Sequence, residues 1–132
     1  MALMIPAIVP EGAVSGAERQ LHPVLRDGLD ESHTVFHSFK AVSPNLDGQL
    51  VDTEIDFLVF SQADGFLVLE VKGGAVVFDG ARGRWYQGER PIHDPFEQAR
   101  VNKHKLRSFL EQRVGKTTPL AMGHAVCFPN TF

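Results

Sequence analysis

Two apolar runs near the middle of the chain restrict its fold more than any other feature. Residues 54–60 (EIDFLVF) and 66–72 (FLVLEVK) each have the length of a strand, and five residues, SQADG, join them. Because successive side chains of a strand point to opposite faces of a sheet, both runs present apolar side chains on both faces. Strands of this kind lie inside a sheet that is covered on each side, which predicts helices on both faces.

The flanking segments supply those helices and further strands. Residues 15–29 have apolar positions at helical spacing, with Ser15 and Glu18 spaced as a capping box and Pro23 predicting a kink or a late start. A longer helix is expected from Asp94, as N-cap, to about Val114. Other strands are expected at residues 34–39, 75–78, 84–86 and 120–128, with a loop at residues 42–49. The main elements follow the order αβββαβ, which predicts a mixed α/β domain with helices packed on a central sheet.

The length and composition indicate one domain. A chain of 132 residues with 43% hydrophobic residues can bury one core but not two. Residues 1–14 are expected to be an N-terminal leader or a first strand, and residues 15–132 the domain, which we expect to be the N-terminal part of a longer protein. No apolar run approaches the roughly 20 residues that cross a bilayer. The single cysteine, Cys127, rules out an internal disulfide and a multi-cysteine zinc site, and it suits the cytoplasm.

Three charged residues occur within the two apolar runs. Glu70 and Lys72 are two residues apart and therefore share a face of their strand. If Phe60 pairs with Phe66 across the five-residue loop, Asp56 lies opposite Glu70, with the two Cβ atoms about 5 Å apart. Facing carboxylates inside a sheet repel each other and lose hydration, and a divalent cation between them removes both costs. Oxygen ligands of this kind favour Mg²⁺ or Mn²⁺ over zinc.

Two alternatives stay open for this group. A loop two residues shorter would place Asp56 opposite Lys72 instead of Glu70. Alternatively, Asp56 and Glu70 sit at solvated strand ends and Lys72 only neutralises their charge, as in many acid-x-Lys triplets. The apolar neighbours of both acids argue against this second alternative, because their positions are ones where a strand would normally carry hydrophobic residues.

An ordered set of four motifs resembles a known family. The motifs are Ser15-Gly16-Ala17-Glu18, Glu54-Ile55-Asp56, Leu69-Glu70-Val71-Lys72-Gly73-Gly74 and Asp94-Pro95-Phe96-Glu97-Gln98. In this order and spacing the chain resembles the nuclease-related domain (NERD) family of the PD-(D/E)xK nuclease superfamily, from about Ser15 to Phe128. Many relatives carry Asn where this chain has Asp94, a difference that concerns only the helix cap. The resemblance implies a restriction-endonuclease-like core, a central mixed sheet flanked by helices.

The resemblance also implies a phosphodiesterase site. Asp56 and Glu70 would bind Mg²⁺ or Mn²⁺ together with the Val71 main-chain carbonyl, and Lys72 would position the attacking water. Glu18 would add a carboxylate, directly or through a water, and Gln98 matches a glutamine that some members place near the site. Plainer roles remain open for the last two residues, since Glu18 can be a capping-box acid alone and Gln98 can simply face water.

The long helix is rich in positive charge. Between residues 100 and 116 there are six basic residues and one acid: Arg100, Lys103, Lys105, Arg107, Arg113, Lys116 and Glu111. Its apolar residues (Ala99, Leu106, Phe109 and Leu110) are expected to face the sheet. A basic stripe can neutralise phosphates, and Arg100, Lys103, Lys105 and Arg107 are the residues we expect to contact nucleic acid. The alternative is an ordinary solvated helix face.

These patterns lead to one functional hypothesis and two rivals. We expect a Mg²⁺- or Mn²⁺-dependent nuclease domain acting on DNA, with RNA left open, within a DNA-processing protein such as a helicase fusion. A homodimer is left open, and no membrane association is expected. The first rival is a non-catalytic module that binds nucleic acid or another partner on the same fold, and the second is a structural α/β domain with solvated acids.

Overall fold

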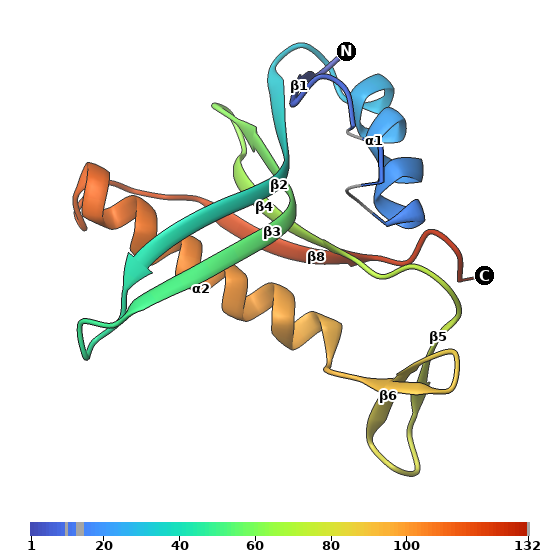
Figure 1. The fold of residues 1–132 in the computed structure, drawn as a ribbon. Helices are drawn as coiled ribbons and strands as arrows, with labels where there is room; N and C mark the ends of the chain where they lie inside the picture. The colour runs from blue at the N-terminus through green and yellow to red at the C-terminus, as the bar shows by residue number, and fades with distance from the viewer. Residues whose placement is uncertain (10, 13–14, 132) are drawn as a thin grey trace.

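A mixed sheet forms the centre of the computed structural model, which describes residues 1–9, 11–12 and 15–131. Within these residues the sheet has five strands in the order β1-β2-β3-β4-β8. Their bounds are β1 Leu3–Ile5, β2 His33–Pro44, β3 Leu50–Ser61, β4 Gly65–Val71 and β8 Met122–Cys127. The strands β2, β3 and β4 are antiparallel, whereas β1 is parallel to β2 and β8 is parallel to β4. Figure 1 shows this sheet between two helices, as the sequence predicts.

The two helices cover opposite faces of the sheet. Helix α1 (Gly16–Gly28) buries Ala17 and Leu21 in a cluster with residues of β2, β3 and β4. Helix α2 (Pro95–Val114) buries Leu106 in a second cluster with other residues of β3 and β4. Strands β3 and β4 contribute side chains to both clusters, so their apolar residues are buried on both faces of the sheet. This confirms that the two apolar runs are interior strands.

The register of the central hairpin is the one expected for a five-residue connection. Phe60 pairs with Phe66 and Leu58 with Val68. The ladder ends at the next pair, Phe57 with Leu69, immediately before Asp56 and Glu70. The two acids are therefore at the point where β3 and β4 separate, just beyond the β3–β4 ladder, although Glu70 still pairs with Val126 of β8.

Local sequence signals set the helix starts. The hydroxyl of Ser15 accepts a hydrogen bond from the Glu18 amide at 3.2 Å, and Glu18 returns the interaction, so the capping box forms. Asp94 caps α2 by accepting from the amides of Phe96 and Glu97. The late start expected from Pro23 is wrong, because α1 is continuous from Gly16 to Gly28 with the proline inside it.

The observed strands extend beyond the expected ones. The loop expected at residues 42–49 is shorter, because the β2–β3 ladder continues to the pair Pro44–Leu50. A second, three-stranded sheet contains β5 (Val76–Asp79), β6 (Arg84–Gln87) and β7 (Arg90–Ile92) in that order. Strand β7 is not among the strands expected from the sequence. Pro91 argues against a strand, but β7 is an edge strand, where a proline removes no ladder hydrogen bond.

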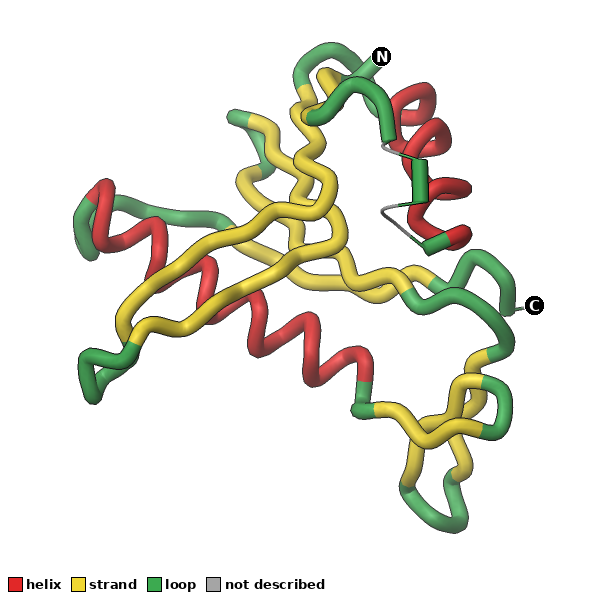
Figure 2. Tube along the Cα trace, viewed as in Figure 1, coloured by secondary structure: helices red, strands yellow, loops and turns green. Residues whose placement is uncertain are grey.

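The three-stranded sheet lies apart from the central one. Figure 2 shows it beyond the end of β4, next to the start of α2. Near the start of the chain, β1 forms one edge of the central sheet, and β8 forms the other edge. In the described part of the chain, no helix combines the length and the apolar character that a membrane crossing requires.

Candidate active site

Asp56 is held at the place where β3 and β4 diverge. The Val71 amide donates a hydrogen bond to Asp56 Oδ2 at 2.9 Å, so a carboxylate takes the place of a main-chain partner beyond the last ladder pair. Burial raises the pKa of Asp56; the Val71 hydrogen bond opposes that shift, and the negative charge of Glu18 adds to it. Asp56 is thus a fixed, partly desolvated carboxylate.

A break in the strand pattern accompanies Asp56. Ile55 and Leu58 are three residues apart, yet both pack in the cluster beneath α2, whereas Phe57 packs on the α1 side. A regular strand would place residues three apart on opposite faces. The shift falls at Asp56, and the corresponding position of β2 is Ser38, which adopts a φ of 55°. A non-glycine residue with this φ is uncommon, and such backbones are often found at functional sites.

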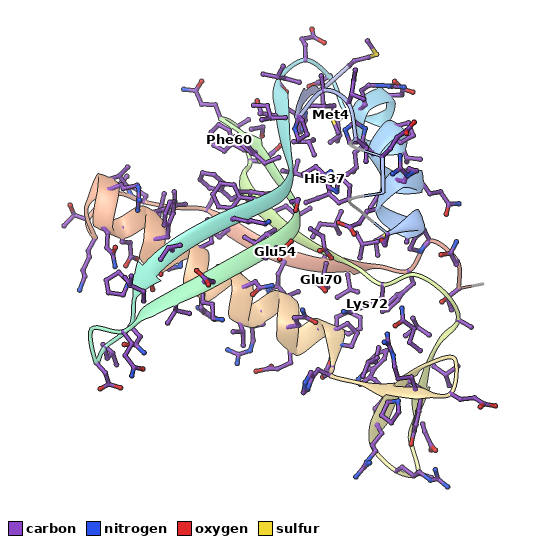
Figure 3. The ribbon with its side chains drawn as sticks, viewed as in Figure 1. Met4, His37, Glu54, Phe60, Glu70 and Lys72 are labelled. Atoms are coloured by element: carbon purple, nitrogen blue, oxygen red, sulfur yellow. The ribbon has the colours of Figure 1, made fainter. Side chains whose placement is uncertain are left out.

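Glu70 is a buried acid in an interior strand. Only 4% of the residue is exposed, and Lys72 Nζ lies 3.2 Å from its Oε1. Burial, followed by the negative charge of Asp56, raises the pKa of Glu70 to about 7, although Lys72 acts in the opposite direction. Figure 3 shows Glu70 and Lys72 side by side near the end of β4. Glu70 is therefore not at a solvated strand end, and Lys72 only partly offsets the cost of its charge.

Glu18 has more than one role in the structure. Besides completing the capping box, its Oε1 lies 3.2 Å from Nε2 of His37 on β2. The His37 side chain is 1% exposed and stacks on the ring of Phe57, with centroids 4.7 Å apart. Figure 3 shows His37 on the side of β2 that faces α1. Nothing in the residue pattern singles out His37, because its link to Glu18 arises only when α1 packs on β2.

The sequence of the chain is similar to one known family. The sequence profile described as "Nuclease-related domain" (NERD) matches residues 13–129, which is most of the chain. The chain belongs to the nuclease-related domain family. No curated protein and no solved structure gives a significant match. Within this nuclease-related domain, Asp56, Glu70 and Lys72 are the charged residues that the fold brings to the end of the β3–β4 ladder.

The chemistry of this group suits a hard divalent cation. Asp56 Oδ1 and Glu70 Oε2 accept no hydrogen bond from the described residues, so each carboxylate keeps one oxygen for a ligand. The raised pKa values of both acids reflect desolvated negative charge that a cation would stabilise. Within residues 1–9, 11–12 and 15–131, however, no three Asp, Glu, His or Cys side chains form a group that could hold a metal. Glu18 therefore does not join Asp56 and Glu70 as a third direct ligand in this arrangement.

The remaining predicted residues lie on α2 and face different directions. Gln98 is exposed and lines a hollow of about 440 Å³ together with Asn102 and Lys105. Lys103 and Arg100 lie on the side of α2 that faces β8. Burial lowers the pKa of His124 on that strand, and the positive charges of Lys103 and Arg100 contribute to the shift.

The expected basic stripe is therefore divided. Arg107 donates to the Leu120 carbonyl at 3.3 Å, near the start of β8, and Arg100 is paired with Glu97. At 3.6 residues per turn, residues 100, 103 and 107 share one side of the helix, and residue 105 lies about 140–160° away from them. The apolar side is as expected, because Ala99 and Leu106 are completely buried against the sheet.

The site depends on a close approach between α1 and the end of β4. A methyl group at Gly73 would lie 2.9 Å from Cβ of Ala17, closer than two such carbons can approach. The side chain of Asn130 holds the next residue, because its Oδ1 accepts a hydrogen bond from the Gly74 amide at 3.1 Å. The glycine therefore lets the first turn of α1, which carries Glu18, pack against the chain that leaves Lys72.

We expect Gly73→Ala to destabilise the protein by about 1–2 kcal/mol, the usual cost of overpacking. Ala17→Gly removes the methyl group that clashes, so the double variant should lose less stability than the two single changes together. Urea unfolding of all four proteins measures this coupling, with Gly80→Ala as the control because a methyl group there meets nothing within 4 Å. Additive effects of the two changes would show that this contact does not position α1.

Proposed function

We propose that this nuclease-related domain is a Mg²⁺- or Mn²⁺-dependent nuclease that hydrolyses phosphodiester bonds in DNA. The observation that carries the proposal is the buried carboxyl of Glu70, 4% exposed and with a pKa of about 7, next to a second desolvated acid, Asp56. A stable fold gains nothing from two such acids inside a sheet, because each costs free energy unless a cation is present. In this proposal Asp56, Glu70 and the Val71 carbonyl hold the metal.

The metal and the protein divide the work. A bound divalent cation would polarise the scissile phosphate and increase the acidity of water. The protein orients the ligands: the Val71 amide fixes Asp56 through Oδ2, and Lys72 fixes Glu70 through Oε1. Each contact leaves the other carboxylate oxygen available. Such pre-set ligands need little rearrangement when the cation arrives.

Lys72 has a second task in the proposed reaction. Its side chain is 24% exposed, so the ammonium group can contact Glu70 and also reach solvent. From there it can donate a hydrogen bond to the attacking water and stabilise the negative charge that develops on the phosphate. Glu18 would act on the cation through a water, because its carboxylate is engaged by Ser15 and His37.

The substrate side of the proposal uses α2. Gln98, in the first turn of the helix, and Lys105 lie on one side, while Arg100, Lys103 and Arg107 lie toward β8. We propose that these basic residues bind phosphates on either side of the catalytic group, which makes binding dependent on salt but not on base sequence. We further propose that the domain serves a longer DNA-processing protein, such as a helicase fusion.

A cleavage assay tests the proposal. Linear and circular DNA, single- and double-stranded, is incubated with the protein in Mg²⁺, Mn²⁺ or EDTA. We expect cleavage with either metal, none in EDTA, and none with Asp56→Asn. Asp52→Asn, which changes an exposed acid of the same strand, should cleave like the wild type. Salt-dependent binding of DNA without cleavage in any metal would instead support the non-catalytic module.

A further inference from the structure

One face of the three-stranded sheet carries a row of apolar side chains. Phe78 of β5 pairs with Trp85 of β6, and Trp85 pairs with Ile92 of β7. Directly paired residues point to the same face of an antiparallel sheet, so the three side chains cross the sheet in line. The rings of Phe78 and Trp85 are in contact, with centroids 5.0 Å apart.

This row continues toward the proposed catalytic group. Trp85 also contacts Phe96, in the first turn of α2, and stacks on Phe128 with the ring planes 10° apart. Phe128 follows the last residue of β8, Cys127, whose carbonyl accepts the hydrogen bond of the Lys72 amide at 3.0 Å. Strand β8 is thus the neighbour of the strand that carries Glu70, and Phe128 of the aromatic cluster directly follows β8.

The cluster is open to solvent. Phe78 is 52% exposed and Phe96 is 46% exposed. A hollow of about 590 Å³ is lined by Phe78, Trp85 and Ile92, and its polar lining includes Arg84 and His93. This volume is in the range of sites that hold small organic groups, and exposed aromatic rings at such a site usually serve recognition. The space around Gln98 is a second hollow, which adjoins this one at His93 and Asp94.

Two charged residues line the hollow, Arg84 and Asp94, and the arginine is the one that can contact an anion. Arg84 lines the hollow from the start of β6, opposite Asp79 in the β5–β6 ladder, and makes no hydrogen bond or ion pair with the described residues. The neighbouring arginines are already engaged, Arg82 with Asp79 and Arg90 with Gln87. The carboxylate of Asp94, which also borders the hollow, accepts hydrogen bonds from two amides of α2. An aromatic row next to a free arginine combines a base-stacking surface with a phosphate contact.

We propose that this hollow binds an unpaired nucleotide of single-stranded nucleic acid, with the base stacked on Phe78 and Trp85 and a phosphate at Arg84. The strand then continues past Phe96 and Phe128 to Lys72. Stacking on aromatic side chains accepts any base, so this site selects single-stranded over duplex substrate without reading sequence. The inference rests on the proposed nuclease function, to which it adds the substrate class.

Trp85 provides a direct measurement because it is the only tryptophan of the chain. In EDTA, where no cleavage is expected, a 12-nucleotide oligothymidylate is titrated into the protein and the tryptophan fluorescence is followed. We expect quenching that saturates, a Kd that increases with salt, and much weaker quenching by the same sequence paired in a duplex. Phe78→Ala should raise the Kd by about 5- to 150-fold, and Arg84→Gln should raise it and reduce its salt dependence.

Val77→Ala is the matched control. Val77 is 56% exposed and adjacent to Phe78, but it points to the other face of β5, so its replacement should leave the Kd unchanged. Melting temperatures show whether each variant is folded. If Phe78→Ala does not fold, Arg84→Gln still tests the inference. An absence of quenching, or an unchanged Kd in both Phe78→Ala and Arg84→Gln, overturns the inference. Fluorescence that changes with protein concentration alone also overturns it, because a second copy of the chain would then occupy the hollow.

The outcomes separate this inference from the proposed function. Quenching in EDTA with no cleavage in any metal would contradict the nuclease activity, and with it the role of the hollow as a substrate site. Cleavage with Mg²⁺ but no quenching would overturn the stacking site and leave the nuclease proposal intact.

Discussion

Replacing Glu70 with glutamine should reduce metal-dependent DNA cleavage by about a thousandfold or more, equivalent to about 4 kcal/mol of transition-state stabilisation. Glutamine has nearly the same shape, so it fits the buried position, but it is neutral and binds a hard cation poorly. It also no longer pairs with the Lys72 ammonium, 3.2 Å away in the wild type. Initial rates with Mn²⁺, compared over a range of metal concentrations, measure the loss.

The design of that experiment separates binding from folding. Glu70→Gln should be folded and at least as stable as the wild type in EDTA, because it removes a buried charge. Lys72→Met should also lose activity, by about 100-fold or more, while Mn²⁺ still binds. A Glu70→Gln variant that cleaves DNA at the wild-type rate would remove Glu70 from the catalytic group. Equal losses in the control Asp52→Asn would point to a general effect of charge.

In the absence of metal, the protein should lose stability as the pH rises from about 4.5 to 7. The folded state raises the pKa of Glu70 from 4.5 to about 7, so it binds the proton more tightly than the unfolded chain does. The stabilisation is present at acid pH and is lost as the pH passes through this window. At 1.36 kcal/mol for each unit of pKa, the loss amounts to about 3 kcal/mol. The raised pKa of Asp56 acts in the same direction.

Urea unfolding in EDTA at pH 5 and pH 8, for the wild type and Glu70→Gln, measures this contribution. The variant lacks the titrating group, so its stability relative to the wild type should increase by about 2.5 kcal/mol between the two pH values. Exposed acids such as Asp30, whose pKa is lowered to about 2 by Ser32 and His33, are the same in both proteins and cancel. Mn²⁺ at pH 8 should restore stability to the wild type alone. A constant difference between the two proteins would mean that Glu70 is ionised throughout.

Local patterns in the sequence predicted the elements that position the site. The apolar runs around Asp56 and Glu70 identified two interior strands, and the length of the loop between them gave the correct register. Caps at Ser15 and Asp94 located both helix starts, because a capping side chain acts on amides two or three residues away. Interactions within a few residues of one another are readable in a single sequence.

Contacts between distant segments could not be predicted in this way. The bond from His37 to Glu18 joins residues 19 apart, and the approach of Gly73 to Ala17 depends on how α1 packs on the sheet. The break in alternation at Asp56 lies opposite Ser38, a residue of the neighbouring strand with a positive φ. These features are set by tertiary packing, and nothing in the residue pattern of either segment alone specifies them.

The basic helix shows a different limit. Its charge was summed along the sequence, but a helix distributes that charge around its axis. Lys105 consequently lies with Gln98, whereas Lys103 lies toward His124 on β8. The cluster of Phe78, Trp85, Phe96 and Phe128 was not predicted either, since its members come from four separate elements or loops.

Calorimetric titration of Mn²⁺ into the metal-free protein at pH 8 tests the central claim most directly, because it needs neither substrate nor turnover. We expect saturable binding by the wild type and by Asp52→Asn, and a loss of at least about tenfold in affinity for both Asp56→Asn and Glu70→Gln. Wild-type affinity in those two variants, or no binding by the wild type, would contradict the claim that Asp56 and Glu70 form a metal site.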